Sequence, residues 1–173
     1  MNAAIERLTA PTEADLEGLA AVLIDCVDGG ASVHFMRPLS AGDAIGFWRR
    51  VAGEVRAADR ALLVARDEHG IAGTVQLILA MPPNQPHRAE LAKMLVHRRA
   101  RNRGLGEALM RAAEDLADDL GRTLLVLDTA SDTAARLYAR CGWTAAGSIP
   151  GFALLPQGGL CATTIFWKAL SCD

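Results

Sequence analysis

The sequence predicts a mixed α/β (α+β) fold, with a central, mostly antiparallel sheet of about six to seven strands flanked by about four helices. Two observations lead to this prediction. Segments with apolar residues at helical spacing alternate along the chain with short runs of strand-like residues. In addition, an amphipathic segment lies between two strand-like runs at 87–97 and 123–129, as in a crossover between parallel strands.

Two helix-like segments come first. Residues 16–27 carry leucines and a valine at three-to-four spacing, and the glycine pair at 29–30 ends that pattern. Ser40 and Asp43 have the spacing of a capping box, and the apolar stripe that follows them includes Trp48 and Val51. We therefore expect two helices before the first strands of the sheet.

The other expected elements follow in order. Residues 61–81 hold two strand-like runs about a turn at 67–70, and three prolines within 81–86 indicate a loop. After the strand at 87–97, a helix from Leu105 to Leu120 ends at Gly121. The run 123–129 predicts a buried strand, 131–142 a further helix, and the last thirty residues a closing antiparallel pair.

Composition limits the classes of partner. One domain over residues 1–173 is expected, because no repeat or linker interrupts the pattern. A formal net charge of −2 and no long apolar stretch argue against nucleic acid or a membrane as partner. The N-terminal segment lacks an apolar signal core, so we expect a cytoplasmic protein, either a monomer or a homodimer. The four cysteines and four histidines lack zinc-site spacing, so no metal is expected.

The segment RNRGLG, residues 101–106, fits the pattern R-x-x-G-x-G at the start of the third helix. A helix N-terminus presents unpaired N–H groups and the positive end of the dipole, and glycine lets the backbone approach a ligand. The pattern predicts a phosphate-binding turn. It is not a dinucleotide fingerprint, because Leu109 occupies the third glycine position, nor a Walker motif, because Glu107 follows Gly106. The alternative is a solvated, arginine-rich loop.

This turn, with a strand before it and a helix after it, resembles the pyrophosphate-binding turn of the GNAT superfamily of acyl-CoA N-acyltransferases. Residues 134–143 form a second family pattern, A-x-x-L-Y-x-x-x-G-W. Segments 30–40, 84–96 and 127–159 further resemble the branch that contains the tabtoxin resistance protein. The resemblance implies an enzyme that moves an acetyl group from acetyl-CoA to a primary amine of a small, amino-acid-like molecule, such as a toxin or antibiotic.

The resemblance also implies which residues bind the cofactor. The strand residues would offer backbone groups to the pantetheine arm, and one of their N–H groups would polarise the thioester carbonyl. Ser131 stands where many family members have asparagine, and Phe152 stands where an aromatic hydroxyl is common in the branch. The cofactor-facing residues implied are Met94, Leu95, Val96, Arg101, Asn102, Arg103, Gly104, Leu105, Gly106 and Ser131.

Acetyl transfer to an amine needs a base, because a lysine-like amine with a pKa of about 10.4 is protonated at neutral pH. Glu90 and Asp128 are the candidates, on strands that should be neighbours, and the resemblance implies carboxylates at both positions. Period-two spacing predicts that Glu90 shares a sheet face with Ala92, Met94 and Val96.

We assign proton removal to Glu90, through water if necessary, and orientation of the amine to Asp128. Each residue has a structural alternative. Glu90 could form a salt bridge with Arg88 or Lys93, and Asp128 could cap the helix that begins near Ser131.

Tyr138 is the only tyrosine of the chain. A lone helical tyrosine is typical of core packing, whereas the resemblance implies that Tyr138 protonates the leaving thiolate. The loop after the first helix shapes the acceptor pocket in the family, which makes His34, Phe35 and Met36 candidate acceptor residues. Two other functions remain open: a non-catalytic acyl-CoA-binding sensor, and an acetyltransferase acting on a protein or peptide amine.

Overall fold

The computed structural model describes residues 3–170 and confirms the predicted mixed α/β fold. Its sheet has seven strands in the order β1-β2-β3-β4-β5-β7-β6, and only β4 and β5 pair in parallel. The elements are β1 (Ala4–Arg7), α1 (Glu13–Asp28), α2 (Ala41–Arg56), β2 (Arg60–Asp67), β3 (Gly70–Ile78), β4 (Arg88–Val96), η1 (Arg98–Ala100), α3 (Leu105–Asp119), β5 (Leu124–Thr129), α4 (Asp132–Arg140), β6 (Thr144–Leu154) and β7 (Leu160–Ala169).

Strand β1 was not among the elements predicted from the sequence. This strand has four residues, too few for an alternating pattern to stand out from its surroundings. It exists because it pairs antiparallel with β2, from Ala4 opposite Arg66 to Arg7 opposite Leu63. Pairing with a distant strand, rather than local preference, therefore creates the first element of the sheet.

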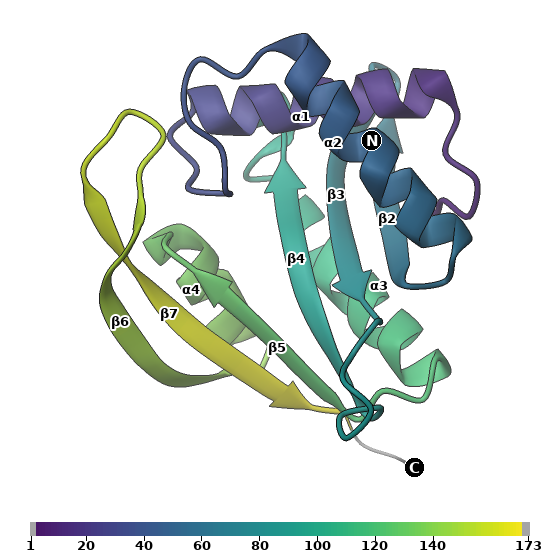
Figure 1. Cartoon of the computed structure of the whole chain (residues 1–173), viewed down its shortest axis with the longest axis vertical. Helices are drawn as coiled ribbons and strands as arrows, with labels where there is room; N and C mark the ends of the chain where they lie inside the picture. The colour runs from purple at the N-terminus through teal and green to yellow at the C-terminus, as the bar shows by residue number, and fades with distance from the viewer. Residues whose placement is uncertain (1–2, 171–173) are drawn as a thin grey trace.

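The helices cover both faces of the sheet. The buried face of α1 and α2, centred on Leu19, Leu23 and Trp48, packs on Leu62 and Val64 of β2. On the opposite face, α3 packs through apolar residues such as Leu109 and Met110. Figure 1 shows α1 and α2 across the upper end of β3 and β4, with α3 behind these strands. The described part of the chain therefore has two apolar cores separated by one sheet.

Two helix starts show how local sequence sets these elements. Ser40 caps α2 as predicted, and its Oγ accepts a 3.0 Å hydrogen bond from the N–H of Asp43. At α1 the capping box is Thr12 with Asp15. In both helices a short polar side chain accepts a hydrogen bond from an N–H group of the first turn. Residues close together in the sequence therefore determine where each helix begins.

A β-bulge interrupts β4. Ala92 pairs with Gln76 and Leu95 with Thr74, so two residues of β4, Lys93 and Met94, stand opposite a single residue of β3. Lys93 has a φ of +49°, in the left-handed region. The predicted grouping of Glu90 with Met94 and Val96 is therefore wrong. The bulge reverses the alternation, so Glu90 and Ala92 share the α1–α2 face with Leu95, while Met94 and Val96 contact the opposite core.

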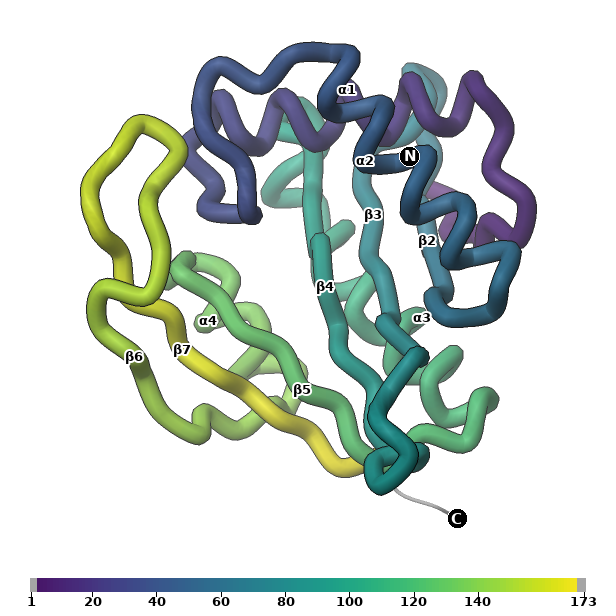
Figure 2. Tube along the Cα trace, viewed as in Figure 1, coloured from purple at the N-terminus to yellow at the C-terminus, as the bar shows by residue number. Residues whose placement is uncertain are grey.

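Strands β4 and β5 separate just before the bulge. Their parallel pairing runs from Arg88 opposite Leu124 only as far as Glu90 opposite Val126, although both strands continue. The traces of the two strands diverge from this point in Figure 2. Because paired side chains in register share a face, Glu90 lies on the same side of the sheet as Val126 and Asp128. The separated strand edges are available to a ligand.

Candidate active site

A cleft of about 980 Å³ opens where β4 and β5 separate. Its walls come from the second half of β4, the end of β5, the start of α3 and the inner side of α4. The loop after α1 and residues 152–155 close it from the other side. This volume is at the upper end of that of small-molecule sites. Most of the predicted site residues line this one cleft, and Arg103, Phe35 and Met36 do not.

The turn before α3 forms one end of the cleft. Gly104 is the N-cap of α3, with a φ of +76°, and it supplies no side-chain acceptor to the first-turn N–H groups. A Cβ added there would meet nothing within 4 Å, so the backbone borders open space. These free N–H groups and the helix dipole suit a phosphate, and the residues present fit the diphosphate of a nucleotide cofactor.

The other residues of the turn have more local roles. Arg101 donates through Nε to the carbonyl of Val96 at 3.0 Å, which ties the turn to the end of β4. A Cβ on Gly106 would lie 3.0 Å from Cδ2 of Leu137, so this glycine lets α3 approach α4 closely. Arg103 is exposed and lies outside the cleft lining. Oγ of Ser131 accepts a 3.2 Å hydrogen bond from the N–H of Ala134 and thereby caps α4.

Both candidate carboxylates line the cleft, each with one oxygen held by a neighbour. Nη1 of Arg88 donates to Oε1 of Glu90 at 2.8 Å, which is one of the two salt bridges considered for Glu90. Oγ1 of the buried Thr163 donates to Oδ2 of Asp128 at 2.7 Å. Asp128 is therefore not the helix cap, because Ser131 fills that role.

Tyr138 lies in α4 with only 5% of its surface exposed, and it also lines the cleft. Its ring packs on Phe166, with centroids 5.7 Å apart, and on Trp143, with centroids 6.3 Å apart. Burial raises the pKa of Tyr138 above its usual range, and the negative charge of Asp128 raises it further. The phenol is therefore protonated at neutral pH, and its ring packs in the core.

The three predicted acceptor residues separate in space. His34 lines the cleft, and its Nδ1 lies 3.0 Å from Nζ of Lys93. Phe35 instead packs edge-on against Phe47 of α2, with centroids 5.3 Å apart. Met36 is 47% exposed and lies outside the cleft lining. Of these three residues, only His34 lines the cleft.

Lys93 is a charged residue of the cleft that was not predicted to be functional. It was considered only as a salt-bridge partner of Glu90, whereas the structure pairs it with His34. Burial and the charge of Arg60 lower the pKa of Lys93 to about 8, against the opposing influence of Asp128. The sequence feature that could have indicated a role for Lys93 is its position in the middle of a mostly apolar strand.

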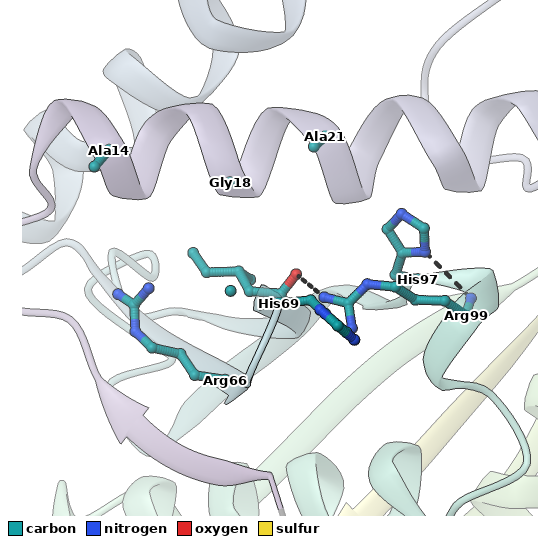
Figure 3. Close-up of a pocket in the computed structure, with 9 residues that line it drawn as sticks. Ala14, Gly18, Ala21, Arg66, His69, His97 and Arg99 are labelled. Carbon is teal, nitrogen blue, oxygen red and sulfur yellow. Dashed lines mark hydrogen bonds between the residues drawn. The ribbon is translucent and has the colours of Figure 1, made fainter.

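A second, smaller pocket of about 200 Å³ lies under α1. Figure 3 shows its basic side chains, Arg66, His69, His97 and Arg99. Both arginines already pair with carboxylates, Arg66 with Glu6 and Asp15 and Arg99 with Asp67. This pocket is therefore part of a network of ion pairs that joins α1 to the β2–β3 turn.

Two further observations concern residues 3–170. No group of three or more His, Cys, Asp or Glu side chains there is arranged to hold a metal ion. None of the helices in the same range combines the length and apolar character needed to cross a bilayer.

Solved structures share this fold. The chain is similar to an N-acetyltransferase from Staphylococcus aureus Mu50, with a TM-score of 0.82, 17% identity, and coverage of 99% of this chain and 100% of that one. A ribosomal-protein-alanine N-acetyltransferase from Brucella melitensis gives a TM-score of 0.78 at 22% identity, covering 96% and 99%. A phosphinothricin acetyltransferase from Sinorhizobium meliloti, solved in complex with acetyl-CoA, gives 0.79 at 18% identity, covering 98% and 89%. The fold is that of the GNAT acetyltransferases.

The sequence itself identifies the family. The model of the acetyltransferase (GNAT) family matches residues 33–143, which is more than half of the chain. The chain belongs to this family, and it is an acetyltransferase whose cosubstrate is acetyl-CoA.

Proposed function

We propose that this enzyme transfers the acetyl group of acetyl-CoA to a primary amine of a small, amino-acid-like molecule by direct attack. The observation that carries the proposal is the single cleft between β4 and β5, which contains the open N-terminus of α3, two carboxylates and the buried phenol of Tyr138. The seven paired strands from Ala4 to Ala169 form one sheet, which supports one catalytic domain over the chain.

The turn residues and β4 would hold the cofactor. The N–H groups after Gly104 would bind the diphosphate, and the unpaired edge of Met94, Leu95 and Val96 would take the pantetheine arm. When bound, acetyl-CoA supplies a thioester whose acyl carbon accepts the amine nitrogen. A backbone N–H of β4 would donate to the thioester oxygen as it gains charge.

The ammonium form of the acceptor first loses a proton to become a nucleophile. When the amine attacks, a new C–N bond forms and the C–S bond breaks, so the nitrogen loses a second proton and the departing sulfur gains one. A carboxylate accepts the protons that the nitrogen loses, directly or through water, and releases them to solvent, while the Tyr138 hydroxyl donates a proton to the sulfur and is reprotonated from solvent. The raised pKa keeps the phenol protonated at neutral pH, so its hydroxyl is available as a donor to the departing sulfur.

The hydrogen bonds favour Asp128 over Glu90 as the proton acceptor. Asp128 accepts from the neutral hydroxyl of Thr163, and its other oxygen has no hydrogen-bond partner among residues 3–170. Glu90 is engaged by the guanidinium of Arg88, which leaves it better suited to attract the ammonium form of the acceptor. We therefore propose the reverse of the division of roles inferred from the sequence.

The proposal also includes the chemical class of the acceptor amine. The resemblance to the branch of the tabtoxin resistance protein supports an amino-acid-like toxin or antibiotic. The structural likeness to a phosphinothricin acetyltransferase supports the same class. The likeness to a ribosomal-protein-alanine N-acetyltransferase favours a second candidate acceptor, the amine of a protein or peptide.

The test is thiol release from acetyl-CoA with a panel of free amino acids, other small amines and short peptides, with products identified by mass spectrometry. We expect N-acetylated small molecules. Acetylated peptides alone would favour the second candidate. Tight binding of acetyl-CoA without turnover by any amine would favour the non-catalytic sensor.

A further inference from the structure

The bulge in β4 places the side chain of Lys93 beside His34, on the side of the cleft formed by the loop after α1. With two residues opposite one of β3, the chain at Lys93 takes a φ of +49°. The ammonium group then lies 3.0 Å from Nδ1 of His34 and 5.7 Å from the centre of the Phe47 ring. Without the extra residue, the alternation of β4 would direct this side chain toward the opposite core.

The charge of Lys93 is not neutralised within the described residues 3–170. No carboxylate lies within 4.0 Å of its nitrogen, whereas the neighbouring arginines, Arg60 and Arg88, pair with Glu54 and Glu90. Its hydrogen-bond partner is an imidazole, and the positive charge of Lys93 lowers the pKa of His34, which therefore remains neutral. A poorly solvated cation that faces a cleft without a counterion is a binding site for an anion.

The charged groups around Lys93 indicate how a bound anion would be oriented in the cleft. Arg60, from β2, opposes the charge on Lys93, and Asp128, from β5, favours it while remaining beyond ion-pair distance. Asp128 also acts on His34 and Tyr138. The cleft lining therefore contains a positive group on β4 and a negative group on β5 that do not form an ion pair with each other. That arrangement is complementary to the carboxylate and ammonium groups of an amino acid.

We infer that Lys93 and His34 form a subsite for the carboxylate of the acceptor, and that this subsite restricts the enzyme to amines that carry such a group. The inference rests on the proposed function. The Lys93 ammonium binds the carboxylate, His34 orients the ammonium through Nδ1, and the acceptor amine lies toward Asp128 and Tyr138. Lys93 determines specificity and takes no part in proton transfer.

The chain has only two lysines, Lys93 and Lys168, so binding can be observed directly at one nitrogen. We would follow the ¹³C-labelled lysine Cε signals by NMR during pH titrations of the CoA-bound enzyme. The probes are N-acetyl derivatives of alanine, methionine, glutamate and phenylalanine, each compared with its carboxamide. We expect at least one acid to raise the pKa of Lys93 from about 8 toward its ordinary value, while the amides and the Lys168 signal show no change. A Lys93 titration that is unaffected by every acid would overturn the subsite.

Kinetics gives the second measurement. Lys93→Met removes the charge at similar length, and we expect it to raise KM about tenfold to a hundredfold for amino acid acceptors, with little change for their carboxamides. Lys93→Arg should restore part of the affinity, and the KM for acetyl-CoA should stay unchanged. Arg50→Met, on the exposed side of α2 and outside the cleft, controls for the loss of one positive charge.

The outcomes separate the two proposals. Equal activity of the wild type on acids and amides, or an equal loss on both in Lys93→Met, would overturn the subsite and leave the acetyltransferase intact. If no amine is acetylated, the proposed function fails, and the NMR titration still decides whether Lys93 binds a carboxylate.

Discussion

Thr163 Oγ1 donates a 2.7 Å hydrogen bond to Oδ2 of Asp128, a residue 35 positions earlier in the chain. The hydroxyl comes from β7 and the carboxylate from the end of β5, two strands that pair antiparallel. The bond holds one oxygen of an otherwise exposed carboxylate and leaves the other oxygen free. It also explains why Asp128 lines the cleft instead of capping α4.

The first prediction separates the two carboxylates. Asp128→Asn keeps an oxygen that can accept from Thr163, so the fold should survive, but the proton acceptor is lost. We expect kcat to fall about a hundredfold or more at neutral pH and to recover partly at high pH, where more amine is already deprotonated. Glu90→Gln should act mainly on the KM of the amine.

Full pH–rate profiles of both variants provide the measurement, with CoA affinity as the control for folding. A large, pH-dependent loss of kcat in Glu90→Gln together with a mere KM effect in Asp128→Asn would reverse the assignment. It would restore the roles first inferred from the sequence.

The second prediction concerns the cofactor turn. Gly104→Val introduces a Cβ at a φ of +76° and places it in the open space that the diphosphate would occupy. We expect calorimetry to find no CoA binding by the folded variant. The matched control is Gly121→Val, since Gly121 follows the other end of α3 with a φ of +70° and open space around it, outside the cleft. Comparable CoA affinity of the two variants would exclude the turn as the diphosphate site.

The third prediction concerns Tyr138 as the proton donor. Tyr138→Phe keeps the ring that packs on Trp143 and Phe166 and removes only the hydroxyl. We expect kcat to fall about a hundredfold to ten-thousandfold, with nearly unchanged KM values. Single-turnover measurements ensure that chemistry is observed. A loss of less than about threefold would leave core packing as the role of this residue.

The fourth prediction concerns the ionisation of the same phenol. Because burial raises its pKa, the folded state holds the proton more tightly than the unfolded chain does. The free energy of unfolding should therefore fall as pH rises above about 10, the pKa of an unfolded tyrosine. Tyrosinate absorbance reports this group alone, since the chain has one tyrosine. Ionisation at the ordinary pKa in the intact protein would contradict the buried environment.

The fifth prediction concerns the core behind the cleft. The buried Glu114 accepts from Nε1 of Trp143 at 2.7 Å and from Nζ of Lys168 at 2.6 Å. Lys168→Met leaves that carboxylate without a cation, and we expect a loss of about 3 kcal/mol in the free energy of unfolding. Urea unfolding should show a lower midpoint with an unchanged slope.

A second substitution tests the cause of that loss. Glu114→Gln combined with Lys168→Met removes both charges and keeps an acceptor for the Trp143 N–H. The double variant should be more stable than Lys168→Met alone. A double variant that is no more stable than Lys168→Met would mean that the packing of Lys168, and not its charge, is what matters.

The cofactor end of the cleft could be predicted from the sequence because its signals are local. The turn at 101–106, the helix that follows it and the parallel crossover all depend on residues close together in the chain, as do the cap at Ser40 and the turn before Gly70. In each of these features, a residue only a few positions away either accepts a hydrogen bond from a backbone N–H group or is a glycine that adopts a positive φ. Glu90, Asp128 and Tyr138 could be placed in the cleft because the crossover brings their elements together.

The acceptor end depends on contacts between distant residues, which local patterns do not record. Alternation alone put Glu90 and Met94 on one face, and only the pairing of β4 with β3 introduces the bulge that separates them. Lys93 meets His34 across 59 positions, and Phe35 turns away from the cleft to pack on Phe47. The sequence by itself determined the elements and the phosphate-binding turn, because backbone propensities and caps act over a few residues. The tertiary structure alone decided which side chains share the acceptor side, because strand register, a bulge and desolvation depend on what the rest of the chain packs against.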